Sequence, residues 1–188
     1  MRAEADTPNP MKVQINAQAY HLRYLPEEDR ILLSVGVPPG RAFGVVLTRR
    51  FTRFLLEALA KIAGERGRVP AGANPVLRDT LLDFEHSQAV ANAVAEGQMR
   101  DEKREEPLAM PPKLIRQLTI APKNNGALAL VFDDPDQLLT IDVGPDRLHM
   151  VIETFVRMSE RAGWDFPPLA GWLDAAKNAG AAASKTLN

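Results

Sequence analysis

The sequence predicts an α+β fold built from two similar units, each with three strands followed by a helix. Three observations lead to this prediction. Apolar strand patterns at 31–35 and 43–47 run into a helical pattern that begins at Thr48. A similar order returns between residues 127 and 163. An extra helical pattern and a charged segment separate the two copies, so the units are expected to form antiparallel sheet or sheets packed on helices.

The first unit contains three strand patterns in succession. Residues 12–24 are expected to form the first strand, in which Tyr20, Leu22 and Tyr24 alternate with His21 and Arg23, as is typical of a strand with one buried face. Turns at 26–29 and 38–40, each containing proline, lead into the strands at 31–35 and 43–47. Such short connections predict an antiparallel meander.

Two helices follow in the first unit. Thr48 is a suitable N-cap, and glycine at 64 or 67 ends the first helix. Its apolar side comprises Phe51, Phe54, Leu55, Ala58, Leu59 and Ile62. Asn74 and Pro75 begin the second helix, which stops near Gly97. The apolar residues of the second helix are Leu77, Leu81, Phe84, Ala91 and Ala95.

The second unit repeats the order after a linker rich in charge. Asn124-Asn125-Gly126 is a strong hairpin signal between strands that contain Leu118 and Leu130. A third strand precedes Gly144-Pro145, which opens the last long helix, and Gly163 ends it. The expected divisions are a tail at 1–10, the first unit with the second helix at 11–97, a linker at 98–112, the second unit with a short C-terminal helix at 113–178, and a tail at 179–188.

The repeat is visible in the apolar positions. A shift of 97 places Ile31, Leu33 and Val35 on Leu128, Leu130 and Phe132. A single unit of three strands and one helix would have a thin core, since small domains bury a smaller fraction of their surface. We therefore expect the two units to pack on each other about a pseudo-twofold axis.

Composition excludes several kinds of chemistry. Hydrophobic residues make up 45% and charged residues 25% of the chain, as in ordinary globular proteins. The absence of cysteine excludes disulfides, a thiol nucleophile, thiolate zinc sites and iron–sulfur clusters. No apolar run is long enough for a membrane helix, and the start of the chain does not resemble a signal peptide, so a cytoplasmic location is expected. Neither a cofactor nor a metal is expected.

The strongest candidate site is the junction before the first helix. Arg49, Arg50 and Arg53 lie in the first helical turn, where the helix dipole disfavours positive charge, and Arg41 could join them. A bound phosphate or nucleic acid would compensate for this cost. A protein partner, or ordinary pairing of the arginines with surface acids, would do so too.

The matching region of the second unit is acidic, with Asp133, Asp134, Asp136, Asp142 and Asp146. Spaced carboxylates suggest calcium, but the glycine and glutamate of an EF-hand loop are missing. Aspartate in turns is also ordinary. The basic and acidic junctions suggest a contact between one unit and the opposite unit of a neighbouring chain.

Other constellations are weaker. Asp79, Asp83 and His86 share one helix face and suggest either a metal site or a solvated surface. Trp164 and Trp172 indicate either closure of the core or a partner-binding surface. No catalytic motif is present, and the serines do not resemble activated nucleophiles. These serines are Ser34, Ser87, Ser159 and Ser184.

These features favour a non-catalytic interaction or scaffold protein that contacts a protein partner or another copy of itself. The strand-rich unit followed by a helix also resembles the architecture of PC4-like and Whirly proteins, which have four strands and a helix per unit where three are counted here. This resemblance implies binding of single-stranded nucleic acid. The aromatic residues available for stacking are Tyr20, Tyr24 and Phe43. A small hydrolase is a further alternative, without a nucleophile that can be named.

Overall fold

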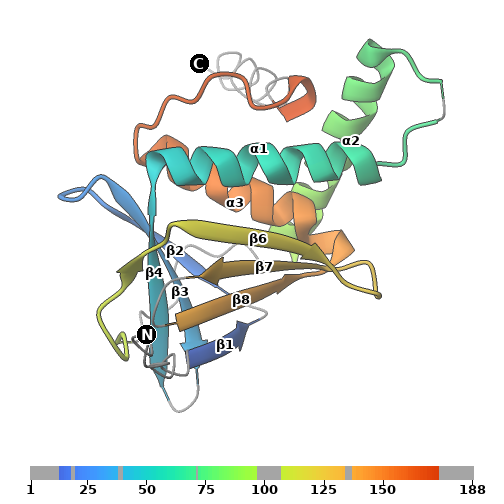
Figure 1. The fold of residues 1–188 in the computed structure, drawn as a ribbon. Helices are drawn as coiled ribbons and strands as arrows, with labels where there is room; N and C mark the ends of the chain where they lie inside the picture. Colours follow the sequence, from blue (N-terminus) through green and yellow to red (C-terminus); the bar gives the residue numbers. More distant parts are fainter. Residues whose placement is uncertain are drawn as a thin grey trace, which may run out of the picture.

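The computed structural model describes residues 13–17, 20–37, 40–70, 72–96, 107–133 and 137–173. Within these residues the chain forms two sheets and a group of helices that lies on one side of them (Figure 1). The strands of one sheet run steeply across those of the other in this view. The predicted α+β class is confirmed.

The first sheet is built mainly from the first half of the chain. The strands β2 (His21–Leu25), β3 (Arg30–Val37) and β4 (Arg41–Thr48) pair as an antiparallel meander. The short strand β5 (Lys113–Leu114), from the second half, pairs in parallel with β4 at its edge. The sheet order is therefore β2-β3-β4-β5.

The second sheet mirrors this arrangement. The strands β6 (Gln117–Pro122), β7 (Leu128–Asp133) and β8 (Gln137–Val143) form an antiparallel meander. The strand β1 (Val13–Ala17), from the first half, pairs in parallel with β8. The order β6-β7-β8-β1 thus repeats the order of the first sheet, with each edge strand supplied by the other half.

This exchange of edge strands between the halves differs from two expectations. The pattern at 12–24 is not one strand, because β1 and β2 lie in different sheets. Each half therefore provides four strands rather than three, and each sheet contains one parallel pair. Ile15 and Leu22 both face the core although an odd number of positions separates them, so the alternation changes phase between β1 and β2.

The helices begin at the predicted caps. In α1 (Arg49–Arg66), the Thr48 hydroxyl accepts a hydrogen bond from the backbone N–H of Phe51 at 3.2 Å. In α2 (Pro75–Ala95), the Asn74 side chain accepts one from Leu77 at 2.9 Å. The last helix starts as a short 3₁₀ turn, η1 (Pro145–Arg147), and continues as α3 (Leu148–Arg161).

One hydrophobic core joins both halves. It contains side chains from both sheets, from α1 and from α3, and it includes both tryptophans. The strand residues matched by the shift of 97 are all buried in it, namely Ile31, Leu33, Val35, Leu128, Leu130 and Phe132. The halves resemble each other in strand order and in these core positions, whereas α2 has no counterpart in the second half.

The end of the expected linker lies along the first sheet. Ala42 donates a backbone hydrogen bond to the carbonyl of Pro107 at 3.0 Å, and Ala109 donates to the carbonyl of Ala42 at 2.7 Å. A β-carbon at Gly44 would come within 3.1 Å of the Leu108 side chain, so glycine allows this close approach. Pro107 to Pro112 therefore cover the side of β4 that faces away from the core.

The helix α2 is placed differently from α1 and α3. It crosses behind α1 near the C-terminal end of that helix in the view of Figure 1, and it contacts α3. Its buried residues are Leu82, His86 and Ala93, whereas Leu77, Phe84, Ala91 and Ala95 are exposed. Most of the apolar residues found along this helix in the sequence thus lie on its solvent side. No helix within the described residues is both long and apolar enough to cross a membrane.

Candidate functional site

The arginines of the first junction have separate partners. The Arg49 guanidinium donates a hydrogen bond to the carbonyl of Asp165 at 2.7 Å and lies 5.9 Å from the centre of the Phe166 ring. Arg50 lies over the Phe54 ring of the same helix at 5.4 Å. These contacts fasten the segment that follows α3 to the start of α1.

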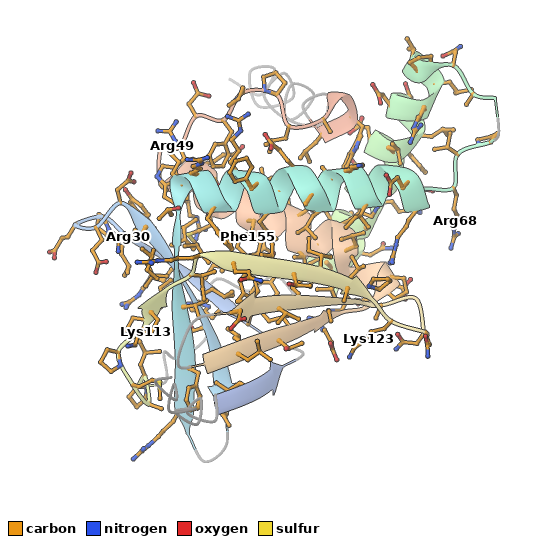
Figure 2. The ribbon with its side chains drawn as sticks, in the orientation of Figure 1. Arg30, Arg49, Arg68, Lys113, Lys123 and Phe155 are labelled. Carbon is orange, nitrogen blue, oxygen red and sulfur yellow. The ribbon has the colours of Figure 1, made fainter. Side chains whose placement is uncertain are left out.

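The remaining two arginines do not complete a shared anion site. Arg53 pairs with Glu57 one turn further along α1, with 2.7 Å between Nε and Oε1. Arg41 begins β4, whereas Arg49 follows the other end of that strand, so the length of β4 separates them. Figure 2 shows Arg49 at the β4 end of α1 and Arg68 near its other end.

The acidic residues of the second half are also dispersed. Asp142 forms an ion pair with Lys123, with 2.5 Å between Nζ and Oδ2. Asp146 is exposed in η1, where a carboxylate suits the positive end of the helix. Asp133 ends β7, and Asp134 and Asp136 lie outside the described residues. The described residues contain no group of three or more histidine, aspartate or glutamate side chains placed to hold a metal.

Trp164 closes the core rather than forming a free surface. It is buried, and its indole N–H donates to Asp29 at 2.6 Å. The Tyr24 hydroxyl donates to the same carboxylate oxygen at 2.9 Å. The hydrogen bond from Trp164, followed by that from Tyr24, lowers the pKa of Asp29 below its usual value. Asp29 therefore links the β2–β3 turn to the segment after α3.

The second tryptophan lies in a buried cluster that periodicity did not predict. The Trp172 ring lies 5.4 Å from the His86 ring and 5.7 Å from the His149 ring, both edge-on. His86 comes from α2 and His149 from α3, and their Nδ1 atoms are 3.3 Å apart. The cluster therefore joins α2, α3 and the C-terminal segment. No sequence spacing connects these residues, because three separate elements supply them.

Glu153 of α3 lies next to this cluster. Its carboxylate lies 3.3 Å from His86 Nε2 and 2.7 Å from Arg157 Nε. Burial would raise the pKa of Glu153, but the hydrogen bonds from His86 and Arg157 hold it below its usual value. His86 Nε2 is placed to donate to this carboxylate, and the two Nδ1 atoms are close enough for one N–H···N hydrogen bond. Burial, followed by the charge of His86, lowers the pKa of His149 to about 4.

The carboxylates of α2 that share a face with His86 do not join the cluster as a ligand set. Asp79 lies against Gly171, where a β-carbon would come 2.5 Å from its Oδ2. One carboxylate oxygen of Asp83 is buried without a hydrogen-bond partner. Since His86 uses both ring nitrogens toward His149 and Glu153, the three residues suggested by the sequence do not converge on one point.

A groove of about 690 Å³ runs between α2, the C-terminal end of α1 and the start of α3. Phe84 and Leu81 supply its apolar wall, and His149 connects it to the buried cluster. Positive side chains, Arg66, Arg68 and Arg147, alternate with negative ones, Glu85, Asp146 and Glu96. Mixed charge of this kind does not select a ligand of one sign.

The outer side of α2 exposes several large apolar side chains. Val76, Leu77, Phe84 and Val94 are exposed by 76%, 46%, 64% and 54%. Among the described residues the other large apolar side chain that is exposed to a comparable extent is Phe54, on α1. Single exposed apolar side chains are common on proteins, whereas several along one helix mark a contact surface. We call this surface, from Val76 to Ala95 on the side away from the core, the outer face of α2.

Comparisons of the chain with protein-family models, with curated proteins and with solved structures find no match.

Proposed function

We propose that the chain is a non-catalytic interaction protein that binds a protein partner through the outer face of α2. The observation that carries this proposal is the set of large apolar side chains exposed along that helix. Burying one such side chain contributes about 1.5–3 kcal/mol, so covering several would support a specific contact. The charged junctions contribute less, because Arg49, Arg53 and Asp142 already have partners inside the molecule.

The alternative of a small hydrolase finds no further support. The Ser159 hydroxyl is buried and donates to the carbonyl of Phe155 at 2.8 Å in its own helix. Ser87 is exposed on α2, and Ser34 lies within β3. Ser184 lies outside the described residues. A nucleophilic serine needs a base within hydrogen-bond reach, and the two histidines of the buried cluster are oriented toward each other.

Binding of single-stranded nucleic acid is the second candidate. The observation in its favour is the order of four strands followed by a helix in each half, as in PC4-like and Whirly proteins, although the first half carries α2 in addition. Its chemistry is weak, since Tyr20 stacks on Phe155 in the interior and Tyr24 binds Asp29. Phe43 packs against the core. A labelled oligonucleotide whose anisotropy does not rise on titration with the chain at low salt would remove this candidate.

The test of the main proposal compares two phenylalanines that are similarly exposed. The tagged full chain is expressed in its source cells as wild type, Phe84→Glu and Phe54→Glu, and the proteins recovered with each are quantified. Untagged copies of the chain itself are counted among them. We expect Phe84→Glu to lower recovery of the partner by tenfold or more, since about 1.4 kcal/mol corresponds to a factor of ten. Phe54→Glu should retain the partner.

Equal recovery with both variants would overturn the proposal. Circular dichroism and thermal melting of the purified variants serve as the folding control. Both side chains are largely in solvent, so neither substitution should change the stability of the chain by more than about 0.5 kcal/mol.

A further inference from the structure

The outer face of α2 follows a heptad pattern. Its residues recur at alternating intervals of three and four positions, and all of them are exposed. They are Leu77, Thr80, Phe84, Ser87, Ala91 and Val94. A repeat with a mean spacing of 3.5 keeps these side chains on one continuous seam of the helix. Four of the six residues are apolar and two are small and polar, and an apolar seam of this spacing suits a helix that lies along another helix. The seam extends from Leu77 to Val94.

The seam and its borders carry almost no charge. All six seam residues are uncharged. The flanking positions are Val76, Asp83 and Val90 on one side and Leu81, Gln88 and Ala95 on the other. Flanking charges normally select the partner and orientation of paired helices, and like charges exclude self-pairing. Asp83 is the sole charged residue among the seam and flanking positions. The surface therefore has no set of charges to attract a charged partner, and two copies of it would repel each other little.

The sizes of the side chains fit an antiparallel pair of identical helices. Placing the twofold axis beside the middle of α2 sets Leu77 against Val94 of a second copy and Thr80 against Ala91. Phe84 then lies opposite Ser87, so the largest side chain meets a small one. A parallel pair would set Phe84 against itself and Ser87 against itself, leaving a crowded layer next to a void. Both defects cost stability in a packed contact.

We infer that the partner bound by the outer face of α2 is a second copy of this chain, with the two α2 helices antiparallel about a twofold axis. This inference rests on the proposed function, because it names the partner of the same surface. An isologous contact of this kind closes on itself and produces a dimer rather than a filament. It would cover the exposed apolar side chains in both copies at once.

The chain has no cysteine, so introduced cysteines report the pairing directly. Leu77→Cys and Val94→Cys variants, one of them isotopically labelled, are mixed and oxidised, and the linked peptides are identified by mass spectrometry. We expect the 77–94 link to dominate. In the antiparallel pair the two copies of residue 77 lie roughly 25 Å apart at about 1.5 Å per residue, too far for a disulfide. Glu65→Cys, exposed on α1, is the control and should remain unlinked.

Links between identical positions, 77–77 and 94–94, would indicate a parallel pair and overturn the antiparallel arrangement. Absence of all links, together with a monomeric mass at every concentration by sedimentation, would overturn self-association. If a different protein were still lost from Phe84→Glu in the recovery experiment, the proposed function would stand and the choice of partner alone would be wrong. If Phe84→Glu recovered every protein as well as the wild type does, both the proposed function and the inferred self-association would be wrong.

A second measurement does not depend on disulfide chemistry. The mass of the purified wild type should rise toward that of a dimer with concentration. Phe84→Glu should shift the midpoint of this rise to a concentration at least about tenfold higher, whereas Phe54→Glu should leave it in place. Because the seam is uncharged, added salt should not weaken the association. A dimer that dissociates with salt would instead point to the charged junctions.

Discussion

At the scale of single residues, the polar contacts of this protein hold separate segments together. Asp29 receives hydrogen bonds from Trp164 and Tyr24, and Arg49 donates to the carbonyl of Asp165. His86, His149 and Glu153 join α2 to α3. Arg49, His86 and Trp164, which the sequence suggested for functional sites, each make such a contact between segments.

Replacing Arg49 should loosen the segment after α3 without unfolding the chain. In Arg49→Ala the hydrogen bond to the Asp165 carbonyl and the contact with the Phe166 ring are lost. Arg49 is exposed, so we expect a stability loss below about 1 kcal/mol. Amide hydrogen exchange should nevertheless become faster at residues 164–166 and at Leu169, since Pro167 and Pro168 have no amide hydrogen. Arg50→Ala is the matched control, because Arg50 contacts Phe54 of its own helix. Equal exchange in both variants would contradict this role.

The histidine cluster predicts how stability depends on pH. The pKa of His149 is lowered from 6.5 to about 4 in the folded chain. Between these values the unfolded chain binds a proton that the folded chain does not. Stability is therefore complete above the unfolded pKa and falls as the pH drops through this window. We expect a loss of about 1–2 kcal/mol between pH 7 and pH 4.5, after allowing for the partial exposure of the ring.

His149→Gln should flatten this part of the profile, as measured by chemical denaturation at each pH, whereas His21→Gln should retain it. Measurements stop at pH 4.5 because Glu153 and Asp29, whose pKa values are lowered in the folded chain, add their own loss of stability at lower pH. A profile that is unchanged by His149→Gln would show that the ring is not kept neutral by folding.

At the scale of elements, α2 is a helix with two apolar sides. The inner side buries Leu82, His86 and Ala93, and the outer side presents the uncharged seam. Sequence periodicity found both the helix and its caps at Asn74 and Pro75. It could not show which side faces the core, because Leu77, Leu81 and Phe84 form as good a stripe as the residues that are buried. Only the position of α3 decides between them.

Two leucines of α2 test this orientation with the same substitution. Leu82 is 1% exposed and Leu77 is 46% exposed. Leu82→Ala should cost about 2–4 kcal/mol, since it leaves a cavity in the core. Leu77→Ala should change the stability of the monomer by less than about 0.5 kcal/mol. Denaturant titrations at low protein concentration give both values. A reversed order of the two losses would mean that the helix is turned the other way.

At the scale of the whole molecule, each half supplies one edge strand to the sheet that is built mainly from the other half. Strand β1 of the first half ends the second sheet, and β5 of the second half ends the first sheet. The sequence predicted two similar units and most of their core residues, because alternation and helical spacing record burial. It did not predict the exchange, since alternation records which side chains of a strand are buried and not which sheet the strand joins. The histidine cluster was not predicted for a related reason, since its residues come together only after α2, α3 and the C-terminal segment have packed.

The exchange predicts that neither half is stable alone. Fragments 1–100 and 101–188 each lack one edge strand and about half of the shared core, and small cores are marginal. We expect neither fragment to show a cooperative thermal transition by circular dichroism, and an equimolar mixture to regain one. A first fragment shortened to 18–100 should form a weaker mixture, because the second sheet then loses β1 and its buried Ile15. Cooperative melting of either fragment by itself would show that the core can be divided, and the halves would then be separate domains rather than one interlocked fold.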